Sequence, residues 1–139
     1  MILQVRQTAQ AVFLLVMMLV LQACAASNPI ARADTVEQKA YATYGTFVII
    51  EEQAAKLVSS GRLPRSAVIA IGQADERAKP VADSLLDATL EFTVIKAEYE
   101  ANGEGQDRFV AAMNGLNGWV SRAQPLIANL ISAVKGAEQ

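Results

Sequence analysis

The chain has 139 residues, a formal net charge of −2 and 53% hydrophobic residues, which favours one domain and gives no basic footprint for nucleic acid. It has no histidine and a single cysteine, Cys24, so an intrachain disulfide, a Ser-His or Cys-His catalytic pair and an imidazole metal site are excluded. We therefore expect no enzymatic activity, no metal, no cofactor and no nucleic-acid partner.

The N-terminus has the pattern of an export signal. Arg6 supplies a basic start, and Ala11 to Leu21 is an unbroken apolar run of eleven residues. Such a run suits a signal peptide and is too short to span a bilayer comfortably. The pattern predicts a signal peptide over residues 1–23.

The end of this run, Leu21-Gln22-Ala23-Cys24, resembles the lipobox of bacterial lipoproteins. The resemblance covers the first 24 residues only. It implies cleavage between Ala23 and Cys24, and acylation of Cys24 by chains such as palmitate. Because Ala25 follows instead of an aspartate, it also implies delivery to the outer membrane, facing the periplasm. Two or three acyl chains anchor a protein stably, unlike a single chain.

Two other interpretations of the N-terminus remain open. Ala31-Arg32-Ala33 before Asp34 also fits a signal peptidase I site, which would release a soluble periplasmic protein. The apolar run could instead stay uncleaved as an anchor.

A first helix is predicted from Asp34 to Ser59, after a tether over residues 24–33. Asp34 suits the N-cap because Glu37 follows three residues later, as in a capping box. Gly61 suits the end of the helix. The expected inner face, widened by Ala40 and Phe47, consists of Tyr41, Tyr44, Val48, Ala55 and Val58.

Two longer helices are predicted over residues 65–101 and 106–135, with Pro64 before the first and the turn Asn102-Gly103-Glu104-Gly105 between them. Their apolar residues recur at alternating steps of three and four, which is a helical seam. In the second helix these are Ile71, Ala74, Ala78, Val81, Leu85, Ala88, Phe92, Ile95 and Tyr99. In the third they are Phe109, Met113, Leu116, Val120, Ala123, Ile127, Leu130 and Val134.

The two seams match in an antiparallel register. Facing residues such as Leu85 and Ala123 have residue numbers that always sum to 208. The first and second helices match with a sum of 126, which places Tyr41 against Leu85. The sequence therefore predicts an all-α fold, an up-down-up antiparallel three-helix bundle over residues 34–139 with a long hairpin.

Two features interrupt the predicted helices. Pro80 and Pro125 should each kink a helix, as a shared bend or as a hinge that moves on partner binding. The segment Asn114-Gly115-Leu116-Asn117-Gly118-Trp119 is a poor helix former. It indicates either close helix approach, with Trp119 near Tyr41, or a helix break that presents Trp119 to a ligand.

Charged residues give no specific site. Asp83, Asp87, Glu91 and Glu98 follow one side of the second predicted helix, where a solvated face competes with a cation site or a basic partner. Glu51 could pair with Arg77 or mark a solvated position in the apolar face of the first predicted helix.

The predicted register leaves the hairpin tip uncovered by the first helix. Ile95, Tyr99, Phe109 and Met113 lie there, which predicts an envelope protein partner or self-association. The resulting hypothesis is a membrane-anchored periplasmic lipoprotein that acts, without catalysis, as an adaptor, assembly factor or inhibitor through protein contacts. The alternative is a helical carrier that binds an apolar ligand.

Overall fold

The computed structural model describes residues 29–139, which form three helices joined by short turns. They are α2 (Pro29–Ser59), α3 (Arg65–Asn102) and α4 (Gln106–Ala137). The chain divides into two compact units, Met1–Asp34 and Thr35–Gln139. The predicted signal peptide and its cleavage site lie outside the described residues.

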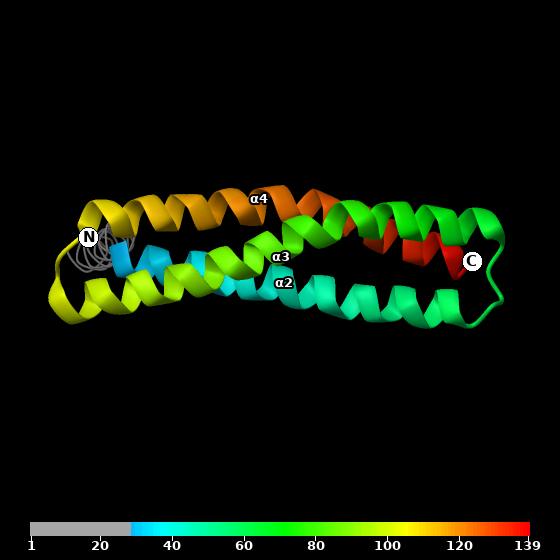
Figure 1. The fold of residues 1–139 in the computed structure, drawn as a ribbon, viewed down its shortest axis with the longest axis horizontal. Helices are drawn as coiled ribbons and strands as arrows, with labels where there is room; N and C mark the ends of the chain where they lie inside the picture. Colours follow the sequence, from blue (N-terminus) through cyan, green and yellow to red (C-terminus); the bar gives the residue numbers. More distant parts are fainter. Residues whose placement is uncertain (1–28) are drawn as a thin grey trace, which may run out of the picture. The chain divides into compact units, whose positions relative to one another are not determined.

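The second unit is a bundle in which the three helices pack against one another. Figure 1 shows successive helices running in opposite directions, so that α2 and α4 run the same way. No strand occurs in the described residues, which confirms the all-α prediction.

Both turns use glycine where the backbone needs a positive φ. Gly103 ends α3 at φ 68°, and its N–H donates to the Tyr99 carbonyl at 2.8 Å, which satisfies a carbonyl of the last turn. Gly61, with φ 67°, follows α2, and Pro64 immediately precedes α3. The predicted boundaries of α3 and α4 are accurate to within two residues.

The seam between α3 and α4 is confirmed. All eight predicted seam residues of α4 are buried, and every predicted seam residue of α3 is buried or half-buried. Leu85 and Leu130 are fully buried, and Ala123 is 1% exposed. At about 25 cal/mol per Å², the burial of this continuous apolar stripe is the main stabilising contribution to the hairpin.

The predicted face of α2 is wrong by one residue. Tyr41 is 46% exposed and Val48 is 42% exposed, whereas Phe47 is buried. The buried or half-buried stripe consists of Ala40, Thr43, Phe47, Ile50, Ala54 and Leu57. One residue rotates a helix by about 100°, so Tyr41, Val48 and Val58 face outward. Tyr44 is half-buried, and Ala40 and Phe47, which the prediction placed at the edge of the face, are buried.

The predicted pairing of α2 with α3 is wrong as well. Glu37 contacts Thr93, and Glu51 contacts Lys79. The residue numbers of both pairs sum to 130 instead of the predicted 126. A difference of four residues corresponds to about one helical turn.

The start of α2 also differs from the prediction. The helix begins at Pro29, so residues 29–33 of the predicted tether are helical and Asp34 is not an N-cap. Proline suits the first turn because its missing N–H would have no helical partner there. Glu37 is used for a contact with α3 instead of a capping box.

The interior prolines leave α3 and α4 continuous. Pro80 and Pro125 lie inside their helices and are exposed. A carbonyl left without its helical donor can therefore face solvent, which lowers the cost of a proline inside a helix. A working hinge at these residues stays a prediction.

The corrected face of α2 is tested by two aromatic residues of similar size. Phe47→Ala should cost about 3–5 kcal/mol because it leaves a cavity in the core. Tyr41→Ala should cost less than about 1 kcal/mol because nearly half of its side chain is in water. Urea denaturation followed by circular dichroism measures the free energy of unfolding of both variants. A larger loss of stability from Tyr41→Ala than from Phe47→Ala would support the face predicted from the sequence.

Candidate functional site

The hairpin tip is part of the core in the described structure. Phe109 is fully buried, Met113 is 3% exposed, Ile95 is 6% exposed and Tyr99 is half-buried. The Phe109 ring stacks on Tyr99 with centroids 4.5 Å apart and lies 5.9 Å from Phe92. The uncovered apolar area that motivated a binding site there is absent. Partner binding at this end stays a prediction without that support.

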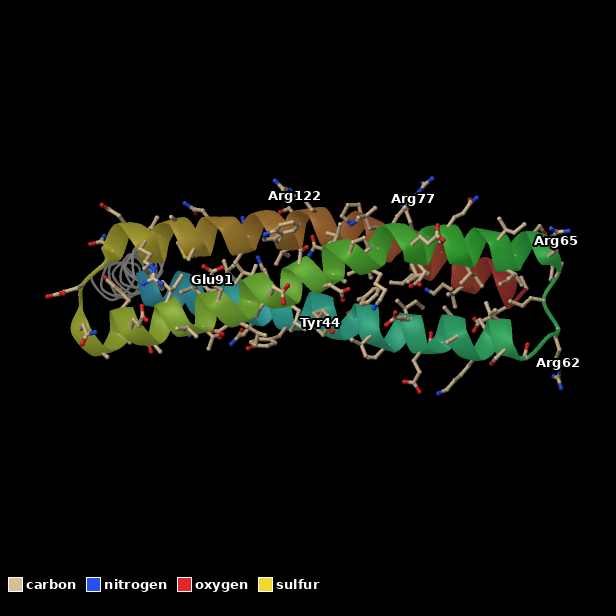
Figure 2. The ribbon with its side chains drawn as sticks, viewed as in Figure 1. Tyr44, Arg62, Arg65, Arg77, Glu91 and Arg122 are labelled. Carbon is tan, nitrogen blue, oxygen red and sulfur yellow. The ribbon has the colours of Figure 1, made fainter. Side chains whose placement is uncertain are left out.

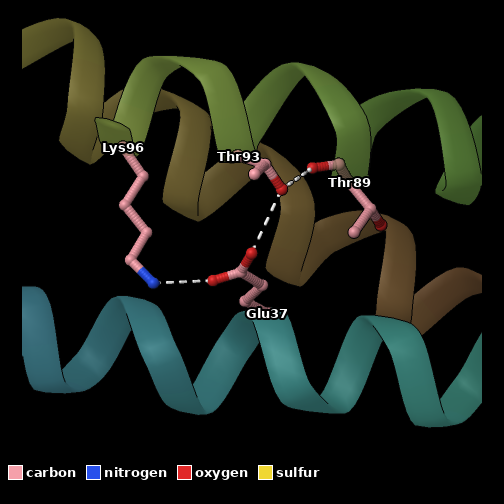
Figure 3. A network of polar contacts seen from close by, with 4 residues as sticks. All are labelled: Glu37, Thr89, Thr93 and Lys96. Atoms are coloured by element: carbon pink, nitrogen blue, oxygen red, sulfur yellow. Dashed lines mark hydrogen bonds and ion pairs between the residues drawn. The ribbon is translucent and has the colours of Figure 1, made fainter. Parts of the chain in front are cut away.

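A charged pair with little solvent exposure joins α2 to α3. Lys96 Nζ lies 2.7 Å from Glu37 Oε2, and the two side chains are 15% and 16% exposed. Thr93 Oγ1 lies 3.1 Å from Glu37 Oε1 and 2.9 Å from the Thr89 carbonyl (Figure 3). The carboxylate thus contacts a cation and a hydroxyl, which compensates its partial desolvation.

A second group of charges surrounds Lys79 on α3. Its Nζ lies 3.4 Å from Glu51 of α2 and 3.8 Å from Asp83. Glu51, followed by Asp83, raises the pKa of Lys79. The sequence left two alternatives open for Glu51, a pair with Arg77 or a solvated position. The pairing of Glu51 with Lys79 differs from both.

Asp75 is the least satisfied polar group among the described side chains. Its Oδ1 is buried without a hydrogen-bond partner. Desolvation raises the pKa of Asp75, nearby Glu51 raises it further, and Lys79 opposes the shift. Within residues 29–139, no three His, Cys, Asp or Glu side chains are placed to hold a metal ion.

The acidic row on α3 faces solvent. Asp83, Asp87, Glu91 and Glu98 are all exposed, and Glu98 pairs with Arg108 at 2.8 Å. Figure 2 shows other charged side chains, such as Arg62 and Arg65 near the α2–α3 turn, pointing away from the helices.

The weak patch of α4 fits neither interpretation that the sequence offered. The helix continues through Asn114–Trp119, so there is no break. A Cβ added to Gly115 or Gly118 would have no atom within 4 Å, so no helix approaches closely. Trp119 is half-buried with the Arg122 guanidinium 5.0 Å from its ring centroid, while Tyr41 faces outward on α2.

An apolar groove lies between α2 and α4. Its volume is about 260 Å³, and it is open to solvent. Alanine, threonine and isoleucine dominate its lining, which consists of Ala42, Thr43, Thr46, Gln124, Ile127, Ala128 and Ile131. We call this feature the α2–α4 groove. The sequence analysis missed it because its α2 wall depends on the face that was predicted wrongly.

The two walls of the groove continue along α2 and α4 as stripes of residues in which every charged member is a lysine. Spaced three or four apart, they share a helix face with the lining. Along α2 the exposed stripe is Lys39, Ala42, Thr46, Ile49, Gln53 and Lys56. Along α4 the stripe is Asn117, Ser121, Gln124, Ala128, Ile131 and Lys135. Lys56 pairs with Glu52 at 2.6 Å, which leaves Lys39 and Lys135 as the cations nearest the two ends of the lining.

The outer face of α3 carries apolar side chains that the bundle does not bury. Leu90 is 53% exposed and Val94 is 57% exposed. They belong to a stripe of residues, all of them exposed, that follow one another at alternating steps of four and three. We call this stripe the α3 ridge. Its members are Asp83, Asp87, Leu90, Val94, Ala97 and Ala101.

Comparison with known proteins gives no relative: no protein-family profile, no curated protein and no solved structure matches this chain. Within the part of the chain that the structure describes, no helix has the length and hydropathy needed to cross a membrane. Cys24 and Ala23 lie outside that part.

The Glu37–Lys96 pair should behave as one energetic unit. Lys96→Met leaves the Glu37 carboxylate poorly compensated, so we expect a loss of about 2–4 kcal/mol, slightly below that for a fully buried pair. Glu37→Met with Lys96→Met removes both charges and should cost less than the single change. A double-mutant cycle measured by denaturant unfolding gives the coupling. Additive losses would mean that the two charges act independently.

Proposed function

We propose that this chain is a lipid-anchored protein of the bacterial envelope whose helical bundle acts by binding another protein. In this proposal, a signal peptide precedes an up-down-up antiparallel bundle, and Cys24 carries the acyl anchor. The protein faces the periplasm from the outer membrane. It serves as an adaptor, assembly factor or inhibitor and catalyses no reaction.

The start of α2 supports cleavage at Cys24 over the alternative site. Cleavage between Ala33 and Asp34 would cut inside α2, which begins at Pro29. Cleavage before Cys24 leaves α2 intact. Only Ala25 to Asn28 then separate Cys24 from the helix, a span of at most about 14 Å when extended.

The exposed apolar side chains support a protein partner and are the observation that carries this part of the proposal. The core already contains large buried side chains such as Phe47, Leu85 and Phe109. Leu90 and Val94, one turn apart on the same face of α3, are more than half exposed and add little to that core. Exposed apolar residues gathered on one helix face are typical of surfaces that another protein covers.

The carrier is the second candidate, favoured by the α2–α4 groove. The groove volume of about 260 Å³ is slightly below the range of about 300–1,000 Å³ typical of small-molecule sites. Since the groove is also open to solvent, it would bury little of a small ligand. The geometry therefore supports a protein contact better than a carried ligand.

The anchor is tested by changing the one cysteine. Cys24→Ser should abolish incorporation of labelled palmitate and leave unprocessed precursor, because the thiol is the acceptor of the diacylglycerol. Ala25→Ser is the matched control and should be labelled normally. Mass spectrometry of the wild-type N-terminus provides the second readout, and a mature protein that begins at Asp34 would contradict the anchor.

The protein-binding role is tested on full-length protein solubilised from membranes in mild detergent. Wild type should run on a native gel in a complex larger than the single chain. The double variant Leu90→Ser with Val94→Ser should run as the free chain while keeping its helix content and melting temperature. Ile69→Ser, an exposed change elsewhere on α3, is the control.

Two results would contradict the protein-binding role. The first is equal mobility of wild type and the double variant. The second is an apolar small molecule found on the purified protein by native mass spectrometry and lost when Ile131→Asp alters the groove. The second result would establish the carrier instead.

A further inference from the structure

The C-terminal part of the α3 ridge is an apolar line that stays exposed in the described structure. Leu90 and Val94 are more than half exposed, and Ala97 and Ala101 continue the line at steps of three and four. Residues spaced in this way lie above one another on one side of a helix, as in the contact line of a coiled coil. The ridge therefore has the form of a helix face prepared for a second helix.

Carboxylates border this apolar line. Asp87 lies three residues before Leu90, and Glu91 lies three residues before Val94. Residues three apart are neighbours on a helix surface, so each exposed apolar side chain has a carboxylate beside it. Within residues 29–139, neither Asp87 nor Glu91 is in an ion pair.

The negative charge on this face is largely uncompensated. Asp87 and Glu91, four residues apart, carry like charges on neighbouring turns and repel each other. The last turn of α3 has no basic residue, so no side chain there balances the negative end of the helix dipole. Glu98, further along the same side, does have a cation, since Arg108 of α4 lies 2.8 Å away. A partner with positive charge would remove the repulsion between Asp87 and Glu91.

We propose that the α3 ridge binds a basic amphipathic helix of another protein. Such a helix has an apolar stripe with steps of three and four, and lysine or arginine along one side of that stripe. The stripe covers Leu90 and Val94, and the cations face Asp87 and Glu91. This inference rests on the protein-binding role proposed above and deepens it, because it names the chemistry of the partner. It does not depend on the lipid anchor.

The form of the ridge favours a helix over an extended segment. A second helix presents its apolar side chains at the same steps of three and four, so the two rows can interdigitate along their length. Ala97 and Ala101 are small, so larger apolar side chains of the partner fit opposite them. From Leu90 to Ala101 the apolar line is about 17 Å long, which about three turns of a partner helix cover.

Charge argues against the other surfaces that could cover the ridge. Nucleic acid and anionic lipid headgroups would be repelled by the carboxylates. A second copy placed ridge to ridge would bring Asp87 and Glu91 of both copies together, which costs free energy. A basic helix compensates these charges instead.

The experiment places a photo-crosslinking amino acid at Ala97 of the full-length chain in intact cells. The matched control carries the same amino acid at Asn129, an exposed residue of α4. Ultraviolet light should give a protein adduct from Ala97 and little from Asn129. Mass spectrometry of the adduct should identify a crosslinked segment that has apolar residues at steps of three and four and a net positive charge.

Charge reversal on the ridge tests the role of the carboxylates. Asp87→Lys with Glu91→Lys should reduce the crosslink from Ala97 about tenfold or more, because attractive contacts become repulsive. Lysine is a good helix former, so circular dichroism should show unchanged helix content and melting temperature. Glu76→Lys with Glu138→Lys is the matched control, because it changes the net charge equally at exposed residues outside the ridge.

An exchange of charges in the partner gives an independent readout. Glutamate in place of the lysine and arginine residues of the crosslinked segment should weaken its crosslink to the wild-type chain. The same change should restore the crosslink to the chain that carries Asp87→Lys with Glu91→Lys. Rescue by reversed charges would not follow from a folding defect.

Four outcomes would overturn the inference. Three of them are a crosslinked segment that is acidic or lacks an apolar helical stripe, a crosslink to a second copy of this chain, and a crosslink that charge reversal on the ridge leaves unchanged. Each of these three still places a protein at the ridge, so the protein-binding role would survive. The fourth is the absence of any protein adduct from Ala97. Together with equal native-gel mobility of wild type and the Leu90→Ser with Val94→Ser variant, it would refute both proposals.

Discussion

The bundle depends on one broad apolar stripe of α3, the helix that contacts both of the others. Leu85, Phe92 and Ile95 lie near the centre of this stripe, and Ala82 and Thr89 widen it by one position. Thr89 can be buried because its hydroxyl donates to the Leu85 carbonyl at 2.6 Å. A helix that packs against two neighbours needs more than a narrow seam, so small side chains fill the added width.

The hairpin of α3 and α4 could be predicted almost completely from the sequence. Its seam positions alternate without a miss, and Gly103 and Gly105 bound the turn between the helices. The face of α2 could not be chosen in this way, because two stripes one residue apart are both largely apolar. The prediction centred the face on Tyr41 and Val48, whereas the structure buries Ala40, Thr43 and Phe47. The one contrary signal was Glu51, a carboxylate within the predicted stripe.

The surface features were harder to predict than the core for a related reason. The Glu37–Lys96 pair can be predicted only if the register between α2 and α3 is known. The matching of residue numbers placed that register one helical turn away. The α2–α4 groove requires the orientation of α2, which two largely apolar stripes on that helix leave undecided in the sequence. A small rotation of one helix thus changes which residues are available to a partner while the core of α3 and α4 stays the same.

The open space around the helical glycines has a consequence for how the molecule fluctuates. A Cβ at Gly45, Gly72, Gly115 or Gly118 would touch nothing, so packing gives these residues no compensation for their poor helix propensity, about 1 kcal/mol each. Local opening needs less free energy where a helix is intrinsically weak. Amide hydrogens around Asn114 to Trp119 should therefore exchange with solvent sooner than those around Leu85. The bundle therefore combines a buried stripe on α3 with a helix, α4, whose middle opens more readily.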